Sequence, residues 1–346
     1  MGNTKGVIHY YIFEFSIDLM KKRIALIAGG YSDEFIISMR SAQTIEKNLD
    51  KERFEVYKII ISREAWWYEP EEGTKIPVDK NDFSLTVQDT KITFDAAFIA
   101  IHGTPGEDGK LLGYLDMMQI PYTSCSSIVS ALTFNKNFCN KVVKDYKVIN
   151  IANSVVLYKN TPYSLGSVLD KIKLPVFVKP NESGSSLGIS KVTDAAQILD
   201  AIERAFKEDD QVLIEEYIAG RELTMGVYKL KGSVICLPPT EIISKNDFFD
   251  LEAKYTTGVT DEITPANISK NVLTQLNQKA KAIYANLNCS GMVRMDFILE
   301  QKTNELFFLE VNTMPGQTEN SLIPQEVVAA GMDLKTFYTN LLDEIL

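Results

Sequence analysis

The chain has 346 residues, enough for two or three domains with a large buried core. Its net charge of −10 argues against a nucleic acid or an anionic membrane as its partner. The four scattered cysteines indicate buried thiols in a reducing compartment, and the presence of only two histidines excludes a histidine-rich metal site. No apolar run reaches the roughly 18 residues that a membrane-spanning helix needs.

Residues 1–19 precede the first clear strand and form an extension whose status the sequence leaves open. The stretch 8–15 is apolar but interrupted, and it has neither a basic start region nor a small-residue cleavage site. We therefore do not interpret it as a signal peptide. It is either a mis-assigned start or a family-specific arm.

Strands and helices alternate through the first third of the chain. Apolar runs predict buried strands, and periodic segments predict helices; the strands are expected at 23–28, 54–61 and 95–101, and the helices at 32–49 and 110–118. Ser32 is expected to cap the first helix. The alternation predicts an open parallel α/β domain over residues 20–125, which binds ligands at the carboxyl ends of its strands.

Two polar residues follow the ends of these strands. Glu34 comes after the first strand and His102 after the third. Both are candidate ligand contacts, because ligands bind at this edge of an open sheet. The alternatives are that Glu34 only complements its helix dipole, and that His102 is a turn histidine bonded to the backbone.

A glycine- and serine-rich loop lies at the centre of the chain. It spans 180–188 between predicted strands at 175–179 and 189–192, after a basic predicted helix at 130–147 that contains Lys136. Backbone N–H groups of such a loop can fold over phosphates. The loop is not a Walker loop, since a strand and not a helix follows it, and an ordinary hairpin turn is the alternative.

The segment 241–262 is long, polar and without a clear period. Strands are predicted before it at 212–218, 224–228 and 234–236, and a helix after it at 272–287. Structureless segments of this length within a compact domain are usually lids or disordered.

Two strands near the C-terminus, 292–299 and 306–312, are predicted to form a hairpin with polar side chains on one face. Pairing about the polar loop between them sets Asp296 opposite Glu310 and Arg294 opposite Asn312. Hard oxygen ligands of this kind suit Mg²⁺ that shares its remaining sites with water and phosphate. The alternative is an ordinary amphipathic hairpin with a solvated face.

The chain after this hairpin begins with a turn. Thr313-Met314-Pro315-Gly316 breaks the second strand and brings flexible backbone N–H groups beside the carboxylates. A loop is expected to about residue 324, and residues 325–346 are expected to be mostly helical.

Six motifs recur along the chain in a fixed order, and from Arg23 to Leu346 the chain resembles the D-alanine–D-alanine ligases of the ATP-grasp superfamily. The motifs are Gly29-Gly30-x-Ser32-x-Glu34, His102-Gly103-x-x-Gly106-Glu107-Asp108-Gly109, Lys179-Pro180 with Gly184-Ser185-Ser186-x-Gly188, Glu252-Ala253-Lys254-Tyr255, Arg294-x-Asp296, and Glu310-x-Asn312-Thr313-x-Pro315-Gly316. The resemblance implies a two-part ATP-grasp fold with antiparallel sheets after the N-terminal domain. Its central lid domain is expected over 126–214 and its catalytic domain over 215–346.

The resemblance also implies how ATP and metal ions are bound. The metal ligands of two Mg²⁺ (or Mn²⁺) ions are expected to be Asp296, Glu310 and Asn312, with Glu310 bridging. Phosphates are expected at Lys136, Lys179, Lys254 and the backbone of the Ser185 loop; adenine is expected at Glu215, Tyr217 and Ile218, and the ribose at Glu222.

The remaining implied roles concern the substrates. Glu34 is expected to pair with the ammonium of the first D-alanine, near His102. The carboxylate of the second is expected at Ser321 and Leu322. Arg294 and the Gly316 N–H are expected to stabilise the oxyanion, and Tyr255 to close the lid by reaching Ser185 and Glu34.

The implied activity is ATP-dependent synthesis of D-alanyl-D-alanine for peptidoglycan through an acylphosphate, by a cytoplasmic homodimer without nucleic-acid or membrane partners. Two alternatives stay open. One is a ligase that joins D-alanine to D-lactate, against which Tyr255 argues. The other is a non-catalytic nucleotide sensor. The argument against it is the complete set of expected transition-state and metal-binding residues, namely Asp296, Glu310, Asn312, Arg294 and Lys254.

Overall fold

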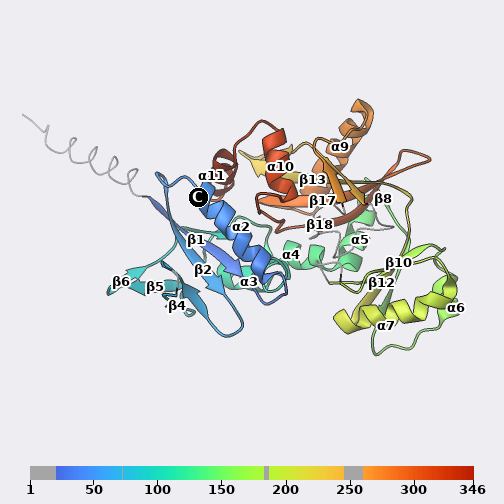
Figure 1. Cartoon of the computed structure of the whole chain (residues 1–346), viewed down its shortest axis with the longest axis horizontal. Helices are drawn as coiled ribbons and strands as arrows, with labels where there is room; N and C mark the ends of the chain where they lie inside the picture. Colours follow the sequence, from blue (N-terminus) through green and yellow to red (C-terminus); the bar gives the residue numbers. More distant parts are fainter. Residues whose placement is uncertain (1–20, 72, 183–186, 245–259) are drawn as a thin grey trace, which may run out of the picture.

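The computed structural model describes residues 21–71, 73–182, 187–244 and 260–346. The extension 1–19 and the predicted site residues Ser185, Lys254 and Tyr255 lie outside these ranges. Within them, the strands form three sheets that occupy three regions of the molecule (Figure 1). None of the helices in these ranges is long and apolar enough to cross a membrane.

The N-terminal sheet has the strand order β6-β5-β4-β3-β2-β1-β7. Its strands are β1 (Lys22–Gly29), β2 (Phe54–Ile61), β3 (Trp66–Tyr68), β4 (Ile76–Asp79), β5 (Ser84–Val87), β6 (Thr90–Ile92) and β7 (Ala96–Ile99). β1 pairs in parallel with β2 and β7, which confirms the predicted parallel core. The four strands β3 to β6 extend it as antiparallel neighbours, which the sequence did not predict.

Two helices pack on opposite faces of this sheet. α2 (Phe35–Asn48) joins a core with Leu26 of β1, whereas α3 (Lys110–Met117) joins the core that contains Ile27. α2 begins later than predicted, because Glu34 and not Ser32 occupies its N-cap position, without a side-chain capping bond. The Ser32 hydroxyl does accept from the Glu34 N–H over 3.4 Å, in the turn before the helix, and it donates to the His102 carbonyl oxygen over 3.0 Å.

The predicted single helix at 130–147 is two helices, α4 (Ser127–Phe134) and α5 (Lys136–Asp145). The break is at Asn135, which has an extended backbone and accepts a hydrogen bond from the Phe138 N–H over 3.0 Å. Asparagine is a preferred N-cap residue, so it begins a second helix here. α5 starts at Lys136 as a result.

The central sheet is wholly antiparallel, in the order β11-β10-β12-β9. Its strands are β9 (Ser154–Tyr158), β10 (Val176–Pro180), β11 (Ser190–Val192) and β12 (Gln211–Glu216), and its helices are α6 (Leu165–Leu169), η1 (Ala195–Gln197) and α7 (Ile198–Glu208). α7 covers one face of the sheet (Figure 1). Among the described residues, the buried side chains of its core lie between residues 157 and 214, and Val155 packs against them.

The C-terminal sheet follows the order β16-β15-β13-β17-β18-β8, with β14 also paired to β13. Its strands are β8 (Asn150–Ile151), β13 (Gly220–Leu230), β14 (Ser233–Cys236), β15 (Thr240–Ser244), β16 (Thr260–Ile263), β17 (Met292–Glu300) and β18 (Leu306–Asn312). Only β8 pairs in parallel, and α9 (Lys270–Asn286) contributes to the core on one face. The antiparallel ATP-grasp sheets expected from the resemblance are therefore present.

The segment 241–262 is not structureless throughout. Its two ends form β15 and β16, which pair from Glu241 opposite Ile263 to Ser244 opposite Thr260. The prediction overlooked these short strands because each is bordered by polar sequence. α10 (Leu322–Ala329) and α11 (Leu334–Asp343) complete the chain, as the predicted helical C-terminus required.

One hydrophobic core joins the two ends of the chain. Leu26 of β1 and Phe98 of β7 share it with residues of α2, α10 and α11. The ring of Tyr338 lies 5.6 Å from that of Phe98, and the ring of Phe337 lies 5.1 Å from that of Tyr228 on β13. The N-terminal sheet and the C-terminal sheet are thus packed as one body, with α2 beside α10 and α11 (Figure 1).

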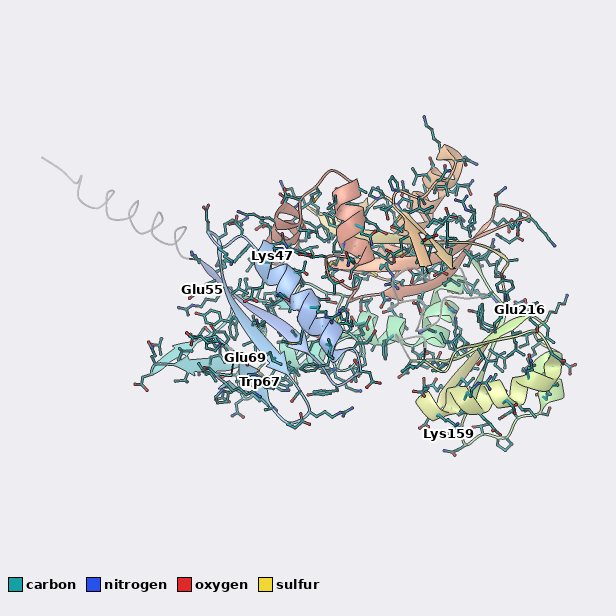
Figure 2. All side chains as sticks on the ribbon, viewed as in Figure 1. Lys47, Glu55, Trp67, Glu69, Lys159 and Glu216 are labelled. Carbon is teal, nitrogen blue, oxygen red and sulfur yellow. The ribbon has the colours of Figure 1, made fainter. Side chains whose placement is uncertain are left out.

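We expect Phe337→Ala to destabilise the N-terminal sheet although Phe337 lies near the other end of the chain. Its side chain is fully buried, and such a truncation costs about 3–5 kcal/mol. The two tryptophans are Trp66 and Trp67 of β3, so tryptophan fluorescence reports on this sheet (Figure 2). In urea titrations followed by tryptophan fluorescence, the urea concentration at the unfolding midpoint should be lower for Phe337→Ala than for the wild type.

The matched control is Leu199→Ala on α7. Leu199 is 45% exposed, so this substitution should leave the unfolding midpoint unchanged. An unchanged midpoint for Phe337→Ala would mean that the N-terminal sheet unfolds independently of the C-terminal helices.

Candidate active site

The predicted register of the C-terminal hairpin is confirmed. Arg294 lies opposite Asn312 and Asp296 opposite Glu310, with a bulge directly after Asp296. Arg294 donates from Nε and Nη2 to the two carboxylate oxygens of Asp296, over 2.9 and 2.7 Å. Thr224 on β13 donates its hydroxyl to the same carboxylate over 2.6 Å. Asp296 is thereby fixed from two strands.

Glu310 lies between two positively charged side chains, those of Arg294 and Lys136. Its carboxylate oxygens are 3.8 Å from Nη2 of Arg294 and 3.5 Å from Nζ of Lys136 at the start of α5. Its side chain keeps 28% of its exposure, whereas those of Arg294 and Lys136 keep 18% and 10%. The Asp296 side chain is only 9% exposed, so Glu310 is the more accessible of the two carboxylates.

Asn312 connects the cluster to the N-terminal domain. When its amide nitrogen faces Glu107, it donates to Oε1 over 2.6 Å, and its amide oxygen then accepts from Arg294 over 2.7 Å. Glu107 also accepts from the Gly103 N–H over 2.7 Å. Burial and the nearby charge of Glu34 raise the pKa of Glu107 to about 8.

Burial alone would lower the pKa of Arg294, but Asp296, Glu310 and Glu107 hold it above its ordinary value. The guanidinium is therefore permanently charged. Glu107 stands in the His102–Gly109 motif but had no predicted role. Its position in that motif was the only signal in the sequence that could have identified it.

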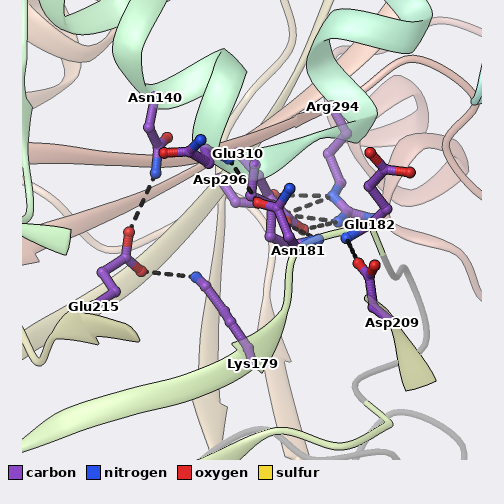
Figure 3. Close-up of polar contacts among 11 residues, drawn as sticks. Asn140, Lys179, Asn181, Glu182, Asp209, Glu215, Arg294, Asp296 and Glu310 are labelled. Carbon is purple, nitrogen blue, oxygen red and sulfur yellow. Dashed lines mark hydrogen bonds and ion pairs between the residues drawn. The ribbon is translucent and has the colours of Figure 1, made fainter. Parts of the chain in front are cut away.

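A second polar cluster lies between β10, β12 and α5. Lys179 donates to Glu215 over 2.7 Å, and Asn140 donates to the other oxygen of Glu215 over 3.2 Å (Figure 3). The Lys179 and Glu215 side chains are only 13% and 4% exposed. Burial opposes the charge of Lys179, but Glu215, Glu310 and Glu222 hold its pKa above the ordinary value.

The backbone of Asn181 fixes the start of α5 beside β10. Its carbonyl oxygen accepts from the Lys136 N–H over 3.2 Å, and its side-chain oxygen accepts from the Asn137 N–H over 2.9 Å. This contact sets the two predicted phosphate lysines, Lys136 and Lys179, on neighbouring elements.

The predicted adenine and ribose residues run from Glu215 in β12 to Glu222 in β13. Tyr217 follows β12 and packs edge-on against Phe177, with 5.8 Å between ring centroids. The Lys191 ammonium lies 4.3 Å from the centre of the Tyr217 ring. Tyr217 and Ile218 are half-buried, and Glu222 lies on β13 opposite Ile298 of β17.

His102 anchors the turn after β18. Its ring nitrogens lie 3.0 Å from the Ser41 hydroxyl and 2.9 Å from the Met314 carbonyl oxygen. Burial lowers its pKa, so the ring is neutral at pH 7. Ser41 also accepts from the Gln317 N–H over 3.1 Å. Both ring nitrogens thus already have partners, which fits the interpretation of His102 as a turn histidine bonded to the backbone.

The turn leads to Ser321 at the N-cap of α10. The Ser321 hydroxyl accepts from the Thr318 N–H over 3.0 Å, and a Cβ on Gly316 would lie 2.8 Å from it. Leu322 is the first residue of α10. Across the site, a Cβ on Gly103 would lie 3.6 Å from the Glu34 carboxylate.

The donor set suits a hard divalent cation. Asp296, Glu310 and Asn312 offer carboxylate and amide oxygens on one face, as Mg²⁺ prefers. Within the described part of the chain, no cluster of three or more His, Cys, Asp or Glu side chains is arranged to hold a metal by itself. A cation here would therefore complete its shell with ligands from outside the protein, such as phosphate oxygens.

Comparison with known proteins identifies the family. The family model described as the D-ala D-ala ligase N-terminus matches residues 23–125, and the one described as the D-ala D-ala ligase C-terminus matches residues 143–343. A protein from Bacteroides thetaiotaomicron named D-alanine–D-alanine ligase is 46% identical over 326 residues, covering 94% of this chain and 99% of the relative.

Solved structures agree with this assignment. The VanG D-Ala:D-Ser ligase from Enterococcus faecalis superposes with a TM-score of 0.85 at 29% identity, covering 94% of this chain and 99% of its own. The D-alanine–D-alanine ligase from Bacillus anthracis complexed with ATP gives a TM-score of 0.72 at 29% identity, with coverage of 94% and 96%. The chain belongs to the D-alanine–D-alanine ligase family of the ATP-grasp superfamily.

Proposed function

We propose that this protein joins two D-alanines into D-alanyl-D-alanine, with conversion of ATP to ADP and phosphate, for peptidoglycan synthesis. The observation that carries the proposal is the largely buried guanidinium of Arg294 held between Asp296 and Asn312, beside the turn that leads to Ser321. A protein that only sensed a nucleotide would have no need of such a group. Membership of the ligase family supports the same conclusion.

Lys136 and Lys179 bind the phosphates of ATP in this proposal, with Lys254 and the backbone of the Ser185 loop at the terminal phosphate. Glu215, Tyr217 and Ile218 bind adenine, and Glu222 binds the ribose. The Bacillus anthracis relative that was solved with ATP supports nucleotide binding by this fold. Domains over 20–125, 126–214 and 215–346 would then enclose the site, with the central one as its lid.

Asp296, Glu310 and Asn312 would hold two Mg²⁺ or Mn²⁺ ions. When bound, these ions neutralise the phosphate charge that otherwise repels an attacking carboxylate. The residues of the chain supply the rest. Lys136 and Arg294 flank Glu310 and fix the direction of its carboxylate, since both lie within 4 Å of it.

The reaction has two steps. Glu34 holds the ammonium of the first D-alanine, whose carboxylate attacks the γ-phosphorus and releases ADP. The amine of the second D-alanine, held through its carboxylate at Ser321 and Leu322, then attacks the acyl carbon, loses a proton, and phosphate leaves. Arg294 and the Gly316 N–H stabilise the oxyanion, and one such donor is typically worth roughly 3–4 kcal/mol. Tyr255 closes the lid through Ser185 and Glu34, and His102 positions the turn.

A second candidate function concerns the acceptor. The Enterococcus faecalis neighbour is named for a D-Ala:D-Ser pair, and D-lactate is a further possible acceptor. We favour D-alanine because the relatives that are 44–46% identical are named D-alanine–D-alanine ligases. We also propose a cytoplasmic homodimer that binds neither nucleic acid nor membrane, in line with the net charge of −10.

The test is product formation by the purified protein. With ATP and Mg²⁺, D-alanine should give ADP and an equal amount of D-alanyl-D-alanine, measured by coupled ADP assay and mass spectrometry. L-alanine should give neither product. D-serine or D-lactate, each mixed with D-alanine, should give less mixed product than dipeptide; a preference for either would favour the second candidate.

We expect Glu310→Gln to lower the rate of ADP release by roughly a thousandfold or more, because it removes a charged ligand from ions that supply several kcal/mol of charge stabilisation. The protein should still fold, since the amide has the same shape as the carboxyl group and Asp296 still pairs with Arg294, and the melting temperature should fall only modestly. Rates should be measured over a range of Mg²⁺ concentrations.

The matched control is Glu319→Gln, an exposed glutamate that pairs with Lys47 on the surface and should retain full activity. A near-normal rate of Glu310→Gln at low Mg²⁺ would contradict the metal assignment.

We expect Lys179→Met to weaken ATP binding by roughly ten- to a hundredfold, because a hydrogen bond to a charged group contributes about 1.5–3 kcal/mol. Calorimetric titration with ATP and Mg²⁺ measures the dissociation constant. Lys159→Met is the control, because Lys159 directly follows β9 of the same sheet but pairs with Asp210 at the surface (Figure 2). Equal dissociation constants for the two variants would show that Lys179 does not contribute to ATP binding.

A further inference from the structure

Glu326 is a fully buried carboxyl group on α10 to which the proposed mechanism gives no role. Its Oε2 accepts a hydrogen bond from the Gly226 N–H on β13 over 2.6 Å, and its Oε1 is bonded to the Thr240 hydroxyl on β15 over 3.1 Å. Thr240 in turn lies 2.7 Å from the Thr264 hydroxyl. A single side chain of α10 thus reaches two strands of the C-terminal sheet.

The Gly226 N–H needs this partner because the edge of β13 changes neighbours at that point. β15 pairs with Glu222 to Thr224, and β14 pairs with Val227 to Leu230. Between these two pairings, the Gly226 carbonyl oxygen accepts from the Leu237 N–H over 2.8 Å. The Gly226 N–H donates to the Glu326 carboxyl group. Buried backbone donors without a partner are costly, so the carboxyl group completes the sheet.

Gly226 also determines how closely α10 approaches the sheet. A Cβ at this position would lie 2.7 Å from Cδ1 of Ile323 and 2.9 Å from Oε2 of Glu326. The helix therefore lies directly on the β13 backbone. On the other edge of β13, Gly226 is paired opposite Arg294. Glu326 consequently links α10 to the strand position beside the proposed oxyanion donor.

We propose that Glu326 is a positioning residue for the second substrate, because it fixes α10 on β13 and so sets Ser321 and Leu322 at a defined distance from Arg294. The inference rests on the proposed function, in which Ser321 and Leu322 hold the carboxylate of the second D-alanine. Glu326 follows Ser321 by five residues, about 7.5 Å along a helix axis, so a tilt or slide at Glu326 moves the start of α10.

Hydrogen bonding, not charge, is what this position requires. Burial raises the pKa of Glu326 to about 8, so the group is mostly neutral at pH 7. A neutral carboxyl has one donor and one acceptor side, and a glutamine amide has the same shape with the same two functions. Glu326→Gln therefore preserves the contacts, whereas Glu326→Leu removes them at similar volume.

The experiment measures dipeptide formation over a wide range of D-alanine concentrations, from which the constants for the first and second D-alanine are separated. Glu326→Leu should raise the constant for the second D-alanine by roughly ten- to a hundredfold, the loss expected from a misplaced binding group. The ATP dissociation constant should be unchanged. Glu326→Gln should restore the wild-type constant for the second D-alanine.

Two further variants make the result specific. Val327→Ala weakens the same helix by packing alone, because Val327 is fully buried beside Glu326, and it should lower the melting temperature without changing the constant. Thr240→Val removes one partner of Glu326 and should raise the constant in the same direction by less. It tests the proposal independently if Glu326→Leu does not fold.

The outcomes distinguish failure of the proposed ligase function from failure of the role proposed for Glu326. If the wild-type protein makes no dipeptide from D-alanine, the proposed function fails and this inference fails with it. If the wild type is active and the constant is unchanged in Glu326→Leu, or in Thr240→Val where Glu326→Leu does not fold, only this inference is overturned. An equal rise in Val327→Ala, or no rescue by Glu326→Gln, overturns it as well.

Discussion

The largely buried charge of Arg294 is the constraint on which the C-terminal half of the molecule depends. An uncompensated guanidinium would be costly in this environment, so acceptors must be brought to it from several elements. Asp296 comes from the same strand, and Asn312 and Glu310 come from β18. Glu107, in a turn of the N-terminal domain, accepts from Asn312 and so orients its amide oxygen toward Arg294. A slip of one residue between β17 and β18 would turn these partners to the other face, so the charge also specifies the register.

The same site depends on the junction of the two ends of the chain. Three residues of the N-terminal half form hydrogen bonds with the backbone of the turn after β18. The partners are the Thr313 carbonyl oxygen for Ser124, the Met314 carbonyl oxygen for His102, and the Gln317 N–H for Ser41. α2, which carries Ser41, is in turn packed against α11 in the shared core. Ligand sites commonly form at such junctions, where two domains each contribute polar groups.

The hairpin could be predicted from the sequence because its signal is local. Alternating polar residues on 292–299 and 306–312 and the loop between them determine which residues face each other, and the pairs Arg294–Asn312 and Asp296–Glu310 are as predicted. The break at Asn135 was missed because the apolar period continues across it. Ser32 was placed at the N-cap of α2, but its hydroxyl accepts from the Glu34 N–H in the turn before the helix and donates to the distant His102 carbonyl, and Glu34 is the N-cap residue.

Glu107, Thr224 and Glu326 were not predicted as parts of the site for a common physical reason. Each is defined by a partner far away in the sequence: Asn312 for Glu107, Asp296 for Thr224 and Gly226 for Glu326. Local patterns give the face of a strand or helix but not which distant group meets it. The strands β3 to β6 were missed similarly, because they are short and half-polar and are held by pairing with neighbours.

The central sheet has a hydrophobic core of its own, whose buried side chains, in the part of the chain that the structure describes, lie within residues 157–214. In the proposed complex, a nucleotide touching Lys179 on that sheet and Glu310 on β18 would join two bodies that do not share an interior. Part of its binding free energy would then be spent on the orientational entropy of one body relative to the other. Affinity for the nucleotide would accordingly depend on the stiffness of the connections between the two bodies, and substitutions there could change it without touching any ligand atom.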